Sequence, residues 1–242
     1  MRVRRYGQIA QLTLWAAIFP VNCYLVREED GFTLVDTTLA VGAPGVARVV
    51  GDRVRDSGAP LRRIALTHAH QDHIGGLDRL RAAFPDCQVL LPARSVPILA
   101  GDLGLLEGEA PGEIRGRYRP VATVPDVLLE DGDRVGSLEV VVSPGHSPDS
   151  VSFRDVRDGA LICGDAFQTK GGLAVSGDRR TLFPWVAAAT WSLPTAIASA
   201  RRLAGLDPSR LMPGHGDVLA DPAGAVASVI ERAGRLDALQ GA

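Results

Sequence analysis

The chain has 242 residues, which is enough for one large folded domain with a well-buried core. Hydrophobic residues make up 46% of it and charged residues 22%, as in ordinary globular proteins. The formal net charge of −2 provides no basic surface for nucleic acid or for an anionic membrane, so we expect neither as a partner. We interpret residues 1–242 as one domain that acts on a small-molecule substrate, as a monomer or a homodimer.

The N-terminal residues combine basic side chains with the apolar run L-T-L-W-A-A-I-F-P-V, a composition similar to that of a secretion signal. Pro20 and Asn22 interrupt this run, and no small-x-small cleavage site follows it. No segment is long and apolar enough to span a bilayer. The three cysteines are odd in number and far apart, which indicates a reducing compartment. We therefore expect a cytoplasmic protein whose first strands begin near Val21.

The predicted elements alternate between strands and helices from this point. Short β-prone runs at 21–26 and 32–36 are separated by E-E-D-G, which predicts a hairpin. Hydrophobic periodicity and composition predict the next four elements, which are a helix at 43–57, a strand at 63–67, a helix at 75–84 and a strand at 87–92.

Residues 93–126 are rich in glycine, proline and acidic residues, so we expect a helical excursion and a long loop there. The later elements are predicted strands at 138–143, 150–154 and 160–163, a clear helix at 191–204, a short strand before P-G-H-G and an amphipathic helix at 222–239. No internal repeat or linker marks a second domain.

All five histidines of the chain lie in three short motifs, T-H-A-H-Q-D-H, P-G-H-S and P-G-H-G, and each motif follows an apolar strand. With two aspartates they form a set of seven imidazole and carboxylate ligands, which are His68, His70, Asp72, His73, His146, Asp165 and His215. Neutral imidazole and carboxylate are the usual nitrogen and oxygen donors to borderline Lewis acids. The set therefore suits two ions such as zinc.

The first motif has a spacing that places ligands on one side of a turn. His68 and His70 lie two residues apart, so on an extended backbone their side chains share a face. Asp72 and His73 follow the turn, where they can address a second ion, and the glycine pair 75–76 allows close packing as the helix begins. A polar turn with histidines by chance is the alternative, and the preceding strand and the glycine pair disfavour it.

The series T-H-A-H-Q-D-H-I-G-G, P-G-H-S, G-D and P-G-H-G resembles the metallo-β-lactamase-fold hydrolase superfamily over nearly the whole chain. This resemblance implies an α/β (α+β) fold, a four-layer αββα sandwich with a metal site at one edge of the two sheets. It implies two divalent metal ions, zinc by expectation, with iron or manganese as alternatives. The implied first metal is held by His68, His70 and His146, and the second by Asp72, His73 and His215, with Asp165 bridging both.

The resemblance also implies metal-assisted hydrolysis of a small acyl substrate, which could be an ester, a lactone or a thioester. A hydroxide that bridges the two ions would attack a carbonyl group polarised by one of them. Asp72 would orient this nucleophile and carry its proton to the leaving group. Asp36, in L-V-D-T, matches a position that supports the ligands from outside, and Ser147 and Ser150 could act likewise.

Residues 167–185, which follow Asp165, are the predicted specificity element. We expect a lid in which Phe183 and Trp185 form an apolar wall, while Gln168 and Lys170, the only lysine, contact the substrate. The alternative is a loop whose aromatic residues pack on the following helix. Lactonases of the family place a tyrosine three residues after the bridging aspartate, where this chain has Gln168. This difference argues against quorum-type lactones but leaves other lactones and esters open.

Several other activities in the same fold remain as alternatives. Glyoxalase II-like thioesterases carry a C-terminal helical extension, whereas 27 residues follow His215 here. Nucleases of the family add a domain or a basic arm, which this chain does not display. Persulfide dioxygenase-like redox enzymes use a single iron, and diiron oxygen reductases replace His70 by glutamate and need a flavin domain. β-Lactam cleavage would be a side activity, and a non-catalytic metal-binding scaffold would hydrolyse nothing.

Overall fold

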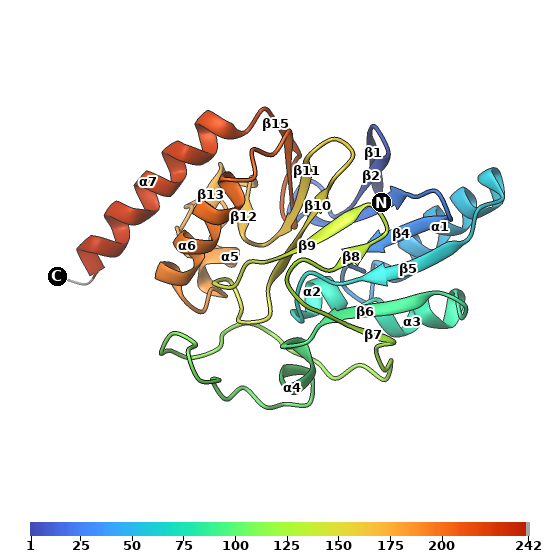
Figure 1. Cartoon of the computed structure of the whole chain (residues 1–242), viewed down its shortest axis with the longest axis horizontal. Coiled ribbons are helices and arrows are strands. Elements are labelled where there is room, and N and C mark those ends of the chain that lie inside the picture. The colour runs from blue at the N-terminus through green and yellow to red at the C-terminus, as the bar shows by residue number, and fades with distance from the viewer. Residues whose placement is uncertain (241–242) are drawn as a thin grey trace.

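The computed structural model describes residues 1–240 and contains two packed β-sheets with helices on both outer faces (Figure 1). The first sheet has the strand order β1 (Arg2–Tyr6), β2 (Ile9–Leu14), β3 (Val21–Arg27), β4 (Phe32–Val35), β5 (Leu61–Ala65), β6 (Gln88–Pro92) and β7 (Val127–Leu129). The second sheet has the order β15 (Leu219–Ala220), β14 (Arg210–Pro213), β11 (Ala160–Gly164), β10 (Val151–Asp155), β9 (Leu138–Val142) and β8 (Arg134–Val135).

Helices cover the outer face of each sheet and complete four layers, so the expected αββα sandwich is confirmed (Figure 1). The first sheet packs against α1 (Ala43–Ser57) and α3 (Leu77–Ala83), and the second against α6 (Leu193–Ala204) and α7 (Ala223–Gln240). The remaining elements are short, namely α2 (Gln71–Ile74), α4 (Ser95–Leu99), α5 (Trp185–Ala188) and a separate two-stranded sheet of β12 (Phe167–Gln168) and β13 (Ala174–Val175).

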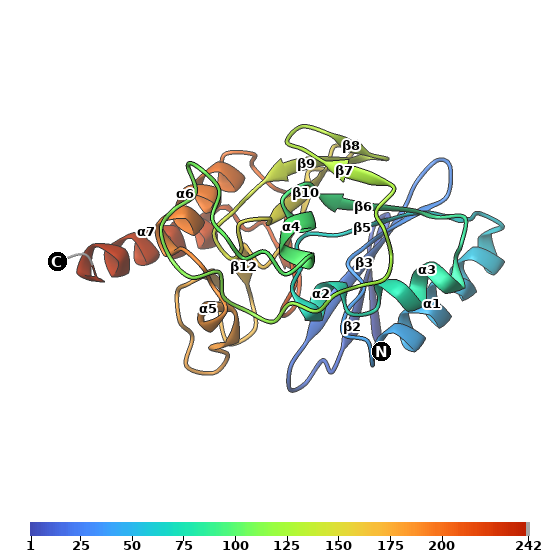
Figure 2. The same cartoon turned by 90° about the horizontal axis from the view of Figure 1, so that it is seen from below.

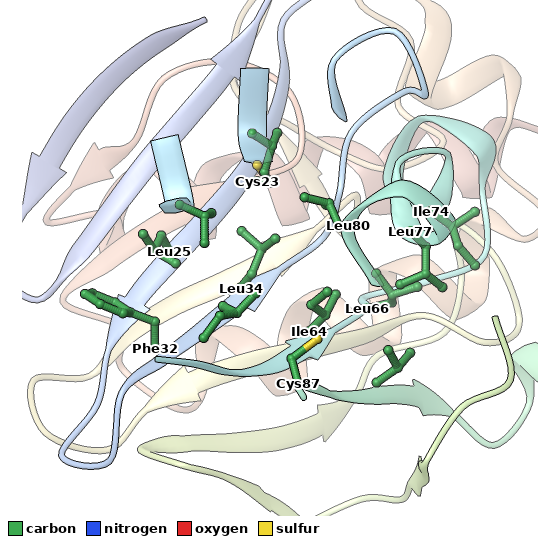
Figure 3. Packing of buried hydrophobic residues seen from close by; sticks show 14 of the residues in the cluster. Cys23, Leu25, Phe32, Leu34, Ile64, Leu66, Ile74, Leu77, Leu80 and Cys87 are labelled. Atoms are coloured by element: carbon green, nitrogen blue, oxygen red, sulfur yellow. The ribbon is translucent and has the colours of Figure 1, made fainter. Parts of the chain in front are cut away.

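Central strands of both sheets bury both faces, because alternate side chains enter different cores. In β3, Cys23 and Leu25 face α1 and α3, as Figure 3 shows, whereas Tyr24 and Val26 enter the core between the sheets. β11 follows the same rule, with its alternate side chains divided between the inter-sheet core and the core under α6 and α7. Three apolar layers therefore hold the four structural layers together.

The polypeptide links the two sheets at the edge where the histidine motifs emerge. The backbone N–H of Val151, at the start of β10, donates to the carbonyl oxygen of Thr67, 2.9 Å away, just after β5. The N–H of Asn22 in β3 donates to Gly214 O at 2.9 Å, and the N–H of Gly214 donates to Gly164 O at 2.8 Å. These bonds form a seam at which the loops after β5, β9, β11 and β14 meet.

The structure corrects three details of the predicted elements. Strands begin at residue 2, because β1 and β2 form an antiparallel hairpin that the apolar run at 12–21 obscured. The helix expected at 75–84 is α3, which begins only at Leu77, and a separate short helix, α2, precedes the glycine pair. The helical excursion and long loop expected at 93–126 are confirmed, because this segment contains α4 and otherwise neither helix nor strand. Residues 167–185 contain the small β12–β13 hairpin.

The other predicted elements lie where expected, and α1 spans the residues 43–57 that its apolar spacing indicated. This helix has proline in its first turn and ends at Gly58, whose φ of 68° is the left-handed conformation that glycine adopts without strain. All three cysteines are buried and free. Within residues 1–240, no helix has both the length and the apolar character needed to cross a membrane.

The inter-sheet core gives a direct test of the packing. Phe153, in β10, is fully buried between the sheets, and Phe153→Ala would leave a cavity there. We expect the free energy of unfolding to fall by about 3–5 kcal/mol in urea denaturation of the metal-free protein. Val124→Ala, at a side chain that is 77% exposed, is the matched control and should change it by less than about 0.5 kcal/mol. Equal effects of the two changes would contradict this packing.

Candidate metal centre

Loops from both sheets bring the seven predicted ligands together at the seam. The turn after β5 carries His68 and His70, and His70 has an extended backbone (φ −65°, ψ 144°) immediately before α2. α2 then carries Asp72 and His73. The second sheet contributes the rest from the loops after β9, β11 and β14, namely His146, Asp165 and His215.

Three imidazole nitrogens converge on one side of the centre. His70 Nδ1 lies 3.1 Å from His68 Nε2 and 2.9 Å from His146 Nε2. Nitrogen ligands about 2.0–2.1 Å from a tetrahedral zinc ion lie about 3.3 Å apart, so this spacing is close to that of ligands on one ion. All three rings are at least 97% buried, as ligands that exclude bulk water should be.

The second group of ligands adjoins the first and contains two carboxylates. His215 Nε2 lies 3.3 Å from Asp72 Oδ2 and 3.2 Å from Asp165 Oδ2. Asp165 also lies 3.4 Å from His146 Nε2 through Oδ2 and 3.4 Å from His73 Nε2 through Oδ1. Asp165 therefore lies between the two groups, where one carboxylate could contact two cations.

Each histidine ring has one nitrogen bonded to an outer partner, which directs the other nitrogen into the centre. The outer bonds are His68 Nδ1 to Thr67 Oγ1 (3.0 Å), His70 Nε2 to Arg115 O (2.9 Å), His73 Nδ1 to Asp36 Oδ2 (2.8 Å), His146 Nδ1 to Thr190 Oγ1 (3.2 Å) and His215 Nδ1 to Pro20 O (2.6 Å). A carbonyl or carboxylate oxygen can only accept, so the outer nitrogens of His70, His73 and His215 donate, and the other nitrogen of each ring faces the centre. Outer partners of this kind orient metal ligands.

Asp36 is the most heavily bonded outer partner. Its carboxylate accepts from the backbone N–H of Thr67 (2.8 Å), from the Thr67 hydroxyl (2.9 Å to Oδ2) and from His73 Nδ1. Asp36 has a φ of 63°, a left-handed conformation that aspartate tolerates better than most residues. One buried carboxylate thus fixes the start of the histidine turn and the ring of a ligand in α2.

Ser147 and Ser150, which we expected to support the ligand rings, form no hydrogen bond with those rings in the described structure. Their hydroxyl groups bond to each other at 2.8 Å and shape the turn that carries His146. Asp149, between them, has the supporting role that the sequence did not reveal. Its Oδ2 accepts from the backbone N–H of Ala69 (2.8 Å), between the first two histidines, and from the Ser95 hydroxyl (2.6 Å). The residues next to Asp149 in the sequence are proline and serine, and this pattern does not indicate a supporting role.

Burial and charge divide the centre into a neutral half and a charged half. Burial lowers the pKa of His146 to about 3 and that of His68 well below its usual value, so both rings are neutral at pH 7. Burial also opposes charge on His215, but Asp165 and Asp72 outweigh it and raise its pKa to about 10. Protons on His73 and His215 balance the carboxylates, and a divalent cation would replace them because a metal-bound imidazole is neutral.

Two buried polar atoms at the heart of the centre have no hydrogen-bond partner in residues 1–240. They are His73 Nε2 and Asp165 Oδ1, which lie 3.4 Å apart. A buried polar atom without a partner destabilises the folded state by about 1–3 kcal/mol. A pair of such atoms in a native core therefore indicates that a ligand binds between them. The donor set is all nitrogen and oxygen, with no thiolate, and it fits borderline divalent cations.

A cavity of about 550 Å³ opens above the ligands. Asp72, Asp165, His70, His146 and His215 line its floor. The rest of its lining is mostly apolar and consists of Trp15, Phe19, Leu39, Gln71, Gly116, Arg117, Trp185, Val186, Ala188 and Ala189. A small substrate could therefore reach the centre through an opening that is lined mostly by apolar side chains.

The predicted specificity element meets this cavity only in part. Trp185 lines it and is 59% exposed, but Phe183 is 1% exposed and does not line it, so the expected place of Phe183 in the apolar wall is wrong. Gln168, expected to contact the substrate, is buried and donates to Lys170 O (2.8 Å) and Phe183 O (3.1 Å). Lys170 Nζ donates to Ala17 O at 2.8 Å and so ties this segment to the β2–β3 loop. These three residues hold the segment in place and do not form the wall.

The β2–β3 loop, which the sequence analysis did not assign to the site, completes the apolar wall beside Trp185. Phe19 lies 6.4 Å from the Trp185 ring and 5.2 Å from the His215 ring, measured between centroids. Trp15, in the same loop, is 50% exposed and has a φ of 47°. The sequence did contain a signal for this wall. Trp15 and Phe19 are two aromatic residues in the turn of a hairpin, where they do not contribute to a core.

Residues 115–118, which we call the strap, cross the histidine turn after the long excursion that follows α4 (Figure 2). Arg115 O accepts from His70 Nε2, and Arg117 O accepts from the backbone N–H of Gln71 at 2.8 Å. Gly116 has a φ of 108° and lies so close to the His70 ring that a side chain would collide with it. The strap therefore needs glycine at this position, where it holds His70 in place.

Comparison with known proteins gives a consistent set of matches. The family model described as the metallo-beta-lactamase superfamily matches residues 17–215. The uncharacterized protein YobT of Bacillus subtilis is 44% identical over 234 residues, which cover 96% of this chain and 99% of that protein. The probable metallo-hydrolase YflN of the same organism is 29% identical over 219 residues, with 81% and 80% covered.

One enzyme and one solved structure extend the comparison. Hydroxyacylglutathione hydrolase of Aeromonas salmonicida is 28% identical over 152 residues, and the match spans only 47% of that protein. The crystal structure of TTHA1623 in a di-iron-bound form has a TM-score of 0.62 and 27% sequence identity, and the match covers 89% of this chain and 96% of that one.

The outer hydrogen bonds of the centre can be tested through Asp36. Asp36→Asn keeps the shape and the backbone preference but presents an amide N–H₂ group to donors, so His73 loses an acceptor. We expect metal affinity, measured by chelator competition, to fall about 10- to 100-fold. Asp56→Asn, an exposed change on α1, is the control and should leave affinity unchanged. Equal affinities of the two variants would contradict the role of Asp36, provided circular dichroism shows both to be folded.

Proposed function

Because the chain belongs to the metallo-beta-lactamase superfamily, we propose that it is a hydrolase that holds two divalent metal ions, zinc by preference, and cleaves a small acyl substrate. The observation that carries the proposal is the position of Asp165 between two complete ligand groups, one of three histidines and one that includes Asp72. A site for a single ion would not need the second group.

The residues present suit this pair of ions. His68, His70 and His146 would hold the first, and Asp72, His73 and His215 the second, with Asp165 shared. When bound, two such ions supply a hydroxide nucleophile at neutral pH and Lewis acidity toward a carbonyl oxygen. Zinc suits a donor set of imidazole and carboxylate, and iron or manganese would fit the same donors.

Asp72 is the ligand best placed to move a proton. Its side chain is 24% exposed, in contrast to the fully buried histidines, and it lines the cavity floor. Burial opposes its charge, but His215 and His73 outweigh it and keep the pKa of Asp72 well below its usual value. As a carboxylate it can accept the proton of the attacking water and give it to the leaving oxygen or sulfur as the bond to the acyl carbon breaks.

The cavity favours an acyl compound over a larger substrate. Trp15, Phe19 and Trp185 form an apolar wall beside the floor, and a volume of about 550 Å³ is that of a small-molecule site. Esters, lactones and thioesters share a carbonyl group that the floor could address, and the wall would accept their hydrocarbon part.

Two alternatives remain specific enough to test. A glyoxalase II-like thioesterase is favoured by the match to hydroxyacylglutathione hydrolase, of which the chain spans about half. A persulfide dioxygenase-like iron enzyme of the same fold would need one metal, and the second ligand group favours two. Metal analysis of the purified protein together with a panel of ester, lactone, thioester and lactam substrates separates the three.

The proposal predicts a large loss of rate without loss of folding in Asp72→Asn. The amide cannot take a proton, so kcat should fall at least about 100-fold on every substrate of the panel. Asp86→Asn, an exposed change in the turn between α3 and β6, serves as the control. His68→Ala should also abolish turnover, by removing a ligand. Wild-type rates in either active-site variant with its metals still bound would refute the assignment.

The apolar wall predicts a change in substrate ranking in Trp185→Ala. Removal of the indole should lower kcat/KM for long acyl chains about tenfold relative to short ones, because each buried methylene contributes about 0.8 kcal/mol. Leu182→Ala is the matched control, since Leu182 is 84% exposed in the same segment but does not line the cavity. An unchanged ranking in Trp185→Ala would exclude this residue from the substrate site.

A further inference from the structure

A second hollow adjoins the metal cavity on the side of the strap. It has a volume of about 540 Å³ and shares Gln71, Gly116 and Arg117 with the metal cavity. The rest of its lining consists of Ile98, Gly101, Leu103, Tyr118 and Arg119. Because the two hollows share three residues, a ligand whose reactive group lies over the metal ligands can extend past Arg117 into the second hollow.

The charge of the second hollow is entirely positive. Of the residues that the structure describes, Arg117 and Arg119 line it and no acidic residue does. Within residues 1–240, neither arginine has a carboxylate oxygen within 4.0 Å of its guanidinium. Among residues 1–240, Arg117 is also the only arginine or lysine that lines the metal cavity. A guanidinium at the junction of two cavities, with no acidic partner in the described part of the chain, is available to an anionic ligand.

The backbone that carries Arg117 is anchored to the metal centre. On one side Arg115 O accepts from His70 Nε2 at 2.9 Å, and Arg117 O itself accepts from Gln71 N at 2.8 Å. Further along, Asp78 accepts from the backbone N–H groups of Ala122 (3.0 Å) and Thr123 (2.8 Å). The segment has no regular secondary structure, yet these bonds fix the position of its backbone relative to the ligands.

The apolar wall of the metal cavity has the opposite chemistry. Trp15, Phe19 and Trp185 line the metal cavity with aromatic surface and bring no charge to it. A compound with two anionic ends would leave one end against this wall without a partner, which is unfavourable. A compound with one hydrocarbon part and one anionic part would satisfy both sides.

We propose that Arg117 binds an anionic group of the substrate, a carboxylate or a phosphate, and that the substrate is an acyl compound with a hydrocarbon part on the aromatic side. This inference rests on the proposed hydrolase function, because it assigns substrate chemistry to the same centre. Guanidinium presents paired N–H donors that match carboxylate and phosphate oxygens, and such bonds are among the stronger ones in proteins. Arg119 extends the positive surface further from the metals.

The test uses the metal-replete protein and matched pairs of substrates that differ in one charge. The first pair is the mono-4-nitrophenyl ester of adipic acid and 4-nitrophenyl hexanoate, with the charge on the acyl part. The second pair consists of the hexanoyl thioesters of 3-mercaptopropionate and of propanethiol, with the charge on the leaving group. A third compound replaces the adipate carboxylate with a phosphate ester, which distinguishes the two anions.

We expect the anionic member of at least one pair to be preferred in kcat/KM. In Arg117→Gln this preference, the ratio of the two kcat/KM values, should fall about 10- to 100-fold, mostly through KM. Arg117→Lys keeps the charge but not the paired donors and should recover part of it. Higher salt should reduce the preference of the wild type, because Arg117 is exposed and therefore screened.

Arg79→Gln is the matched control, since it removes an exposed arginine of α3 that lines neither hollow. The same loss of preference in Arg79→Gln and Arg117→Gln would overturn the inference, because net charge alone would then explain it. The inference would also fail if neither pair showed a preference that depends on Arg117.

A binding measurement separates failure of this inference from failure of the proposed function. Trp15 and Trp185 line the metal cavity, so adipate monoamide and the uncharged hexanamide can be titrated against tryptophan fluorescence without turnover. Binding of the anion that depends on Arg117, in a protein that hydrolyses nothing, would support the anion site and refute the hydrolase. Hydrolysis of both members of each pair at equal rates would support the hydrolase and refute the anion site.

Discussion

The structure depends on a seam at which two sheets are held in fixed register by backbone hydrogen bonds. Val151 N–H donates to Thr67 O, and Asn22 and Gly164 bond to Gly214 on the other side of the centre. Four of the seven candidate ligands come from the first sheet and three from the second, so neither sheet could form the centre alone. A shift of one residue in either sheet would turn alternate side chains to the opposite face and separate the two groups of ligands.

The same seam buries charge that the protein balances only in part. The carboxylate of Asp36 is satisfied by Thr67 and His73, but Asp165 keeps one oxygen without a hydrogen-bond partner within the described residues. Burial of an unpaired polar group is unfavourable, and a bound cation would remove this cost. A ligand that binds only the folded state stabilises it, so metal binding and folding should be coupled in this protein.

The walls of the cavity come from segments outside the histidine motifs. The β2–β3 loop contributes Trp15 and Phe19, and the strap contributes Arg117. The bond from Lys170 Nζ to Ala17 O ties the β2–β3 loop to the segment after Asp165, and the bond from His70 Nε2 to Arg115 O ties the strap to the histidine turn. Under the proposed function the floor would supply the chemistry and these two segments would select the substrate, which is the usual division between a scaffold and its loops.

The sequence by itself indicated most of the strands and helices and the set of candidate ligands, because strand alternation, helix periodicity and histidines placed after strands are local patterns. The four layers of the fold were implied by the family resemblance of the histidine motifs. It did not determine the outer partners of the rings, since two of them are the carbonyl oxygens of Pro20 and Arg115, and every residue has a carbonyl oxygen. It also misplaced Phe183 and missed Arg117, because burial and cavity lining depend on which segments meet. Only the tertiary structure brings residues so far apart in the chain to one cavity.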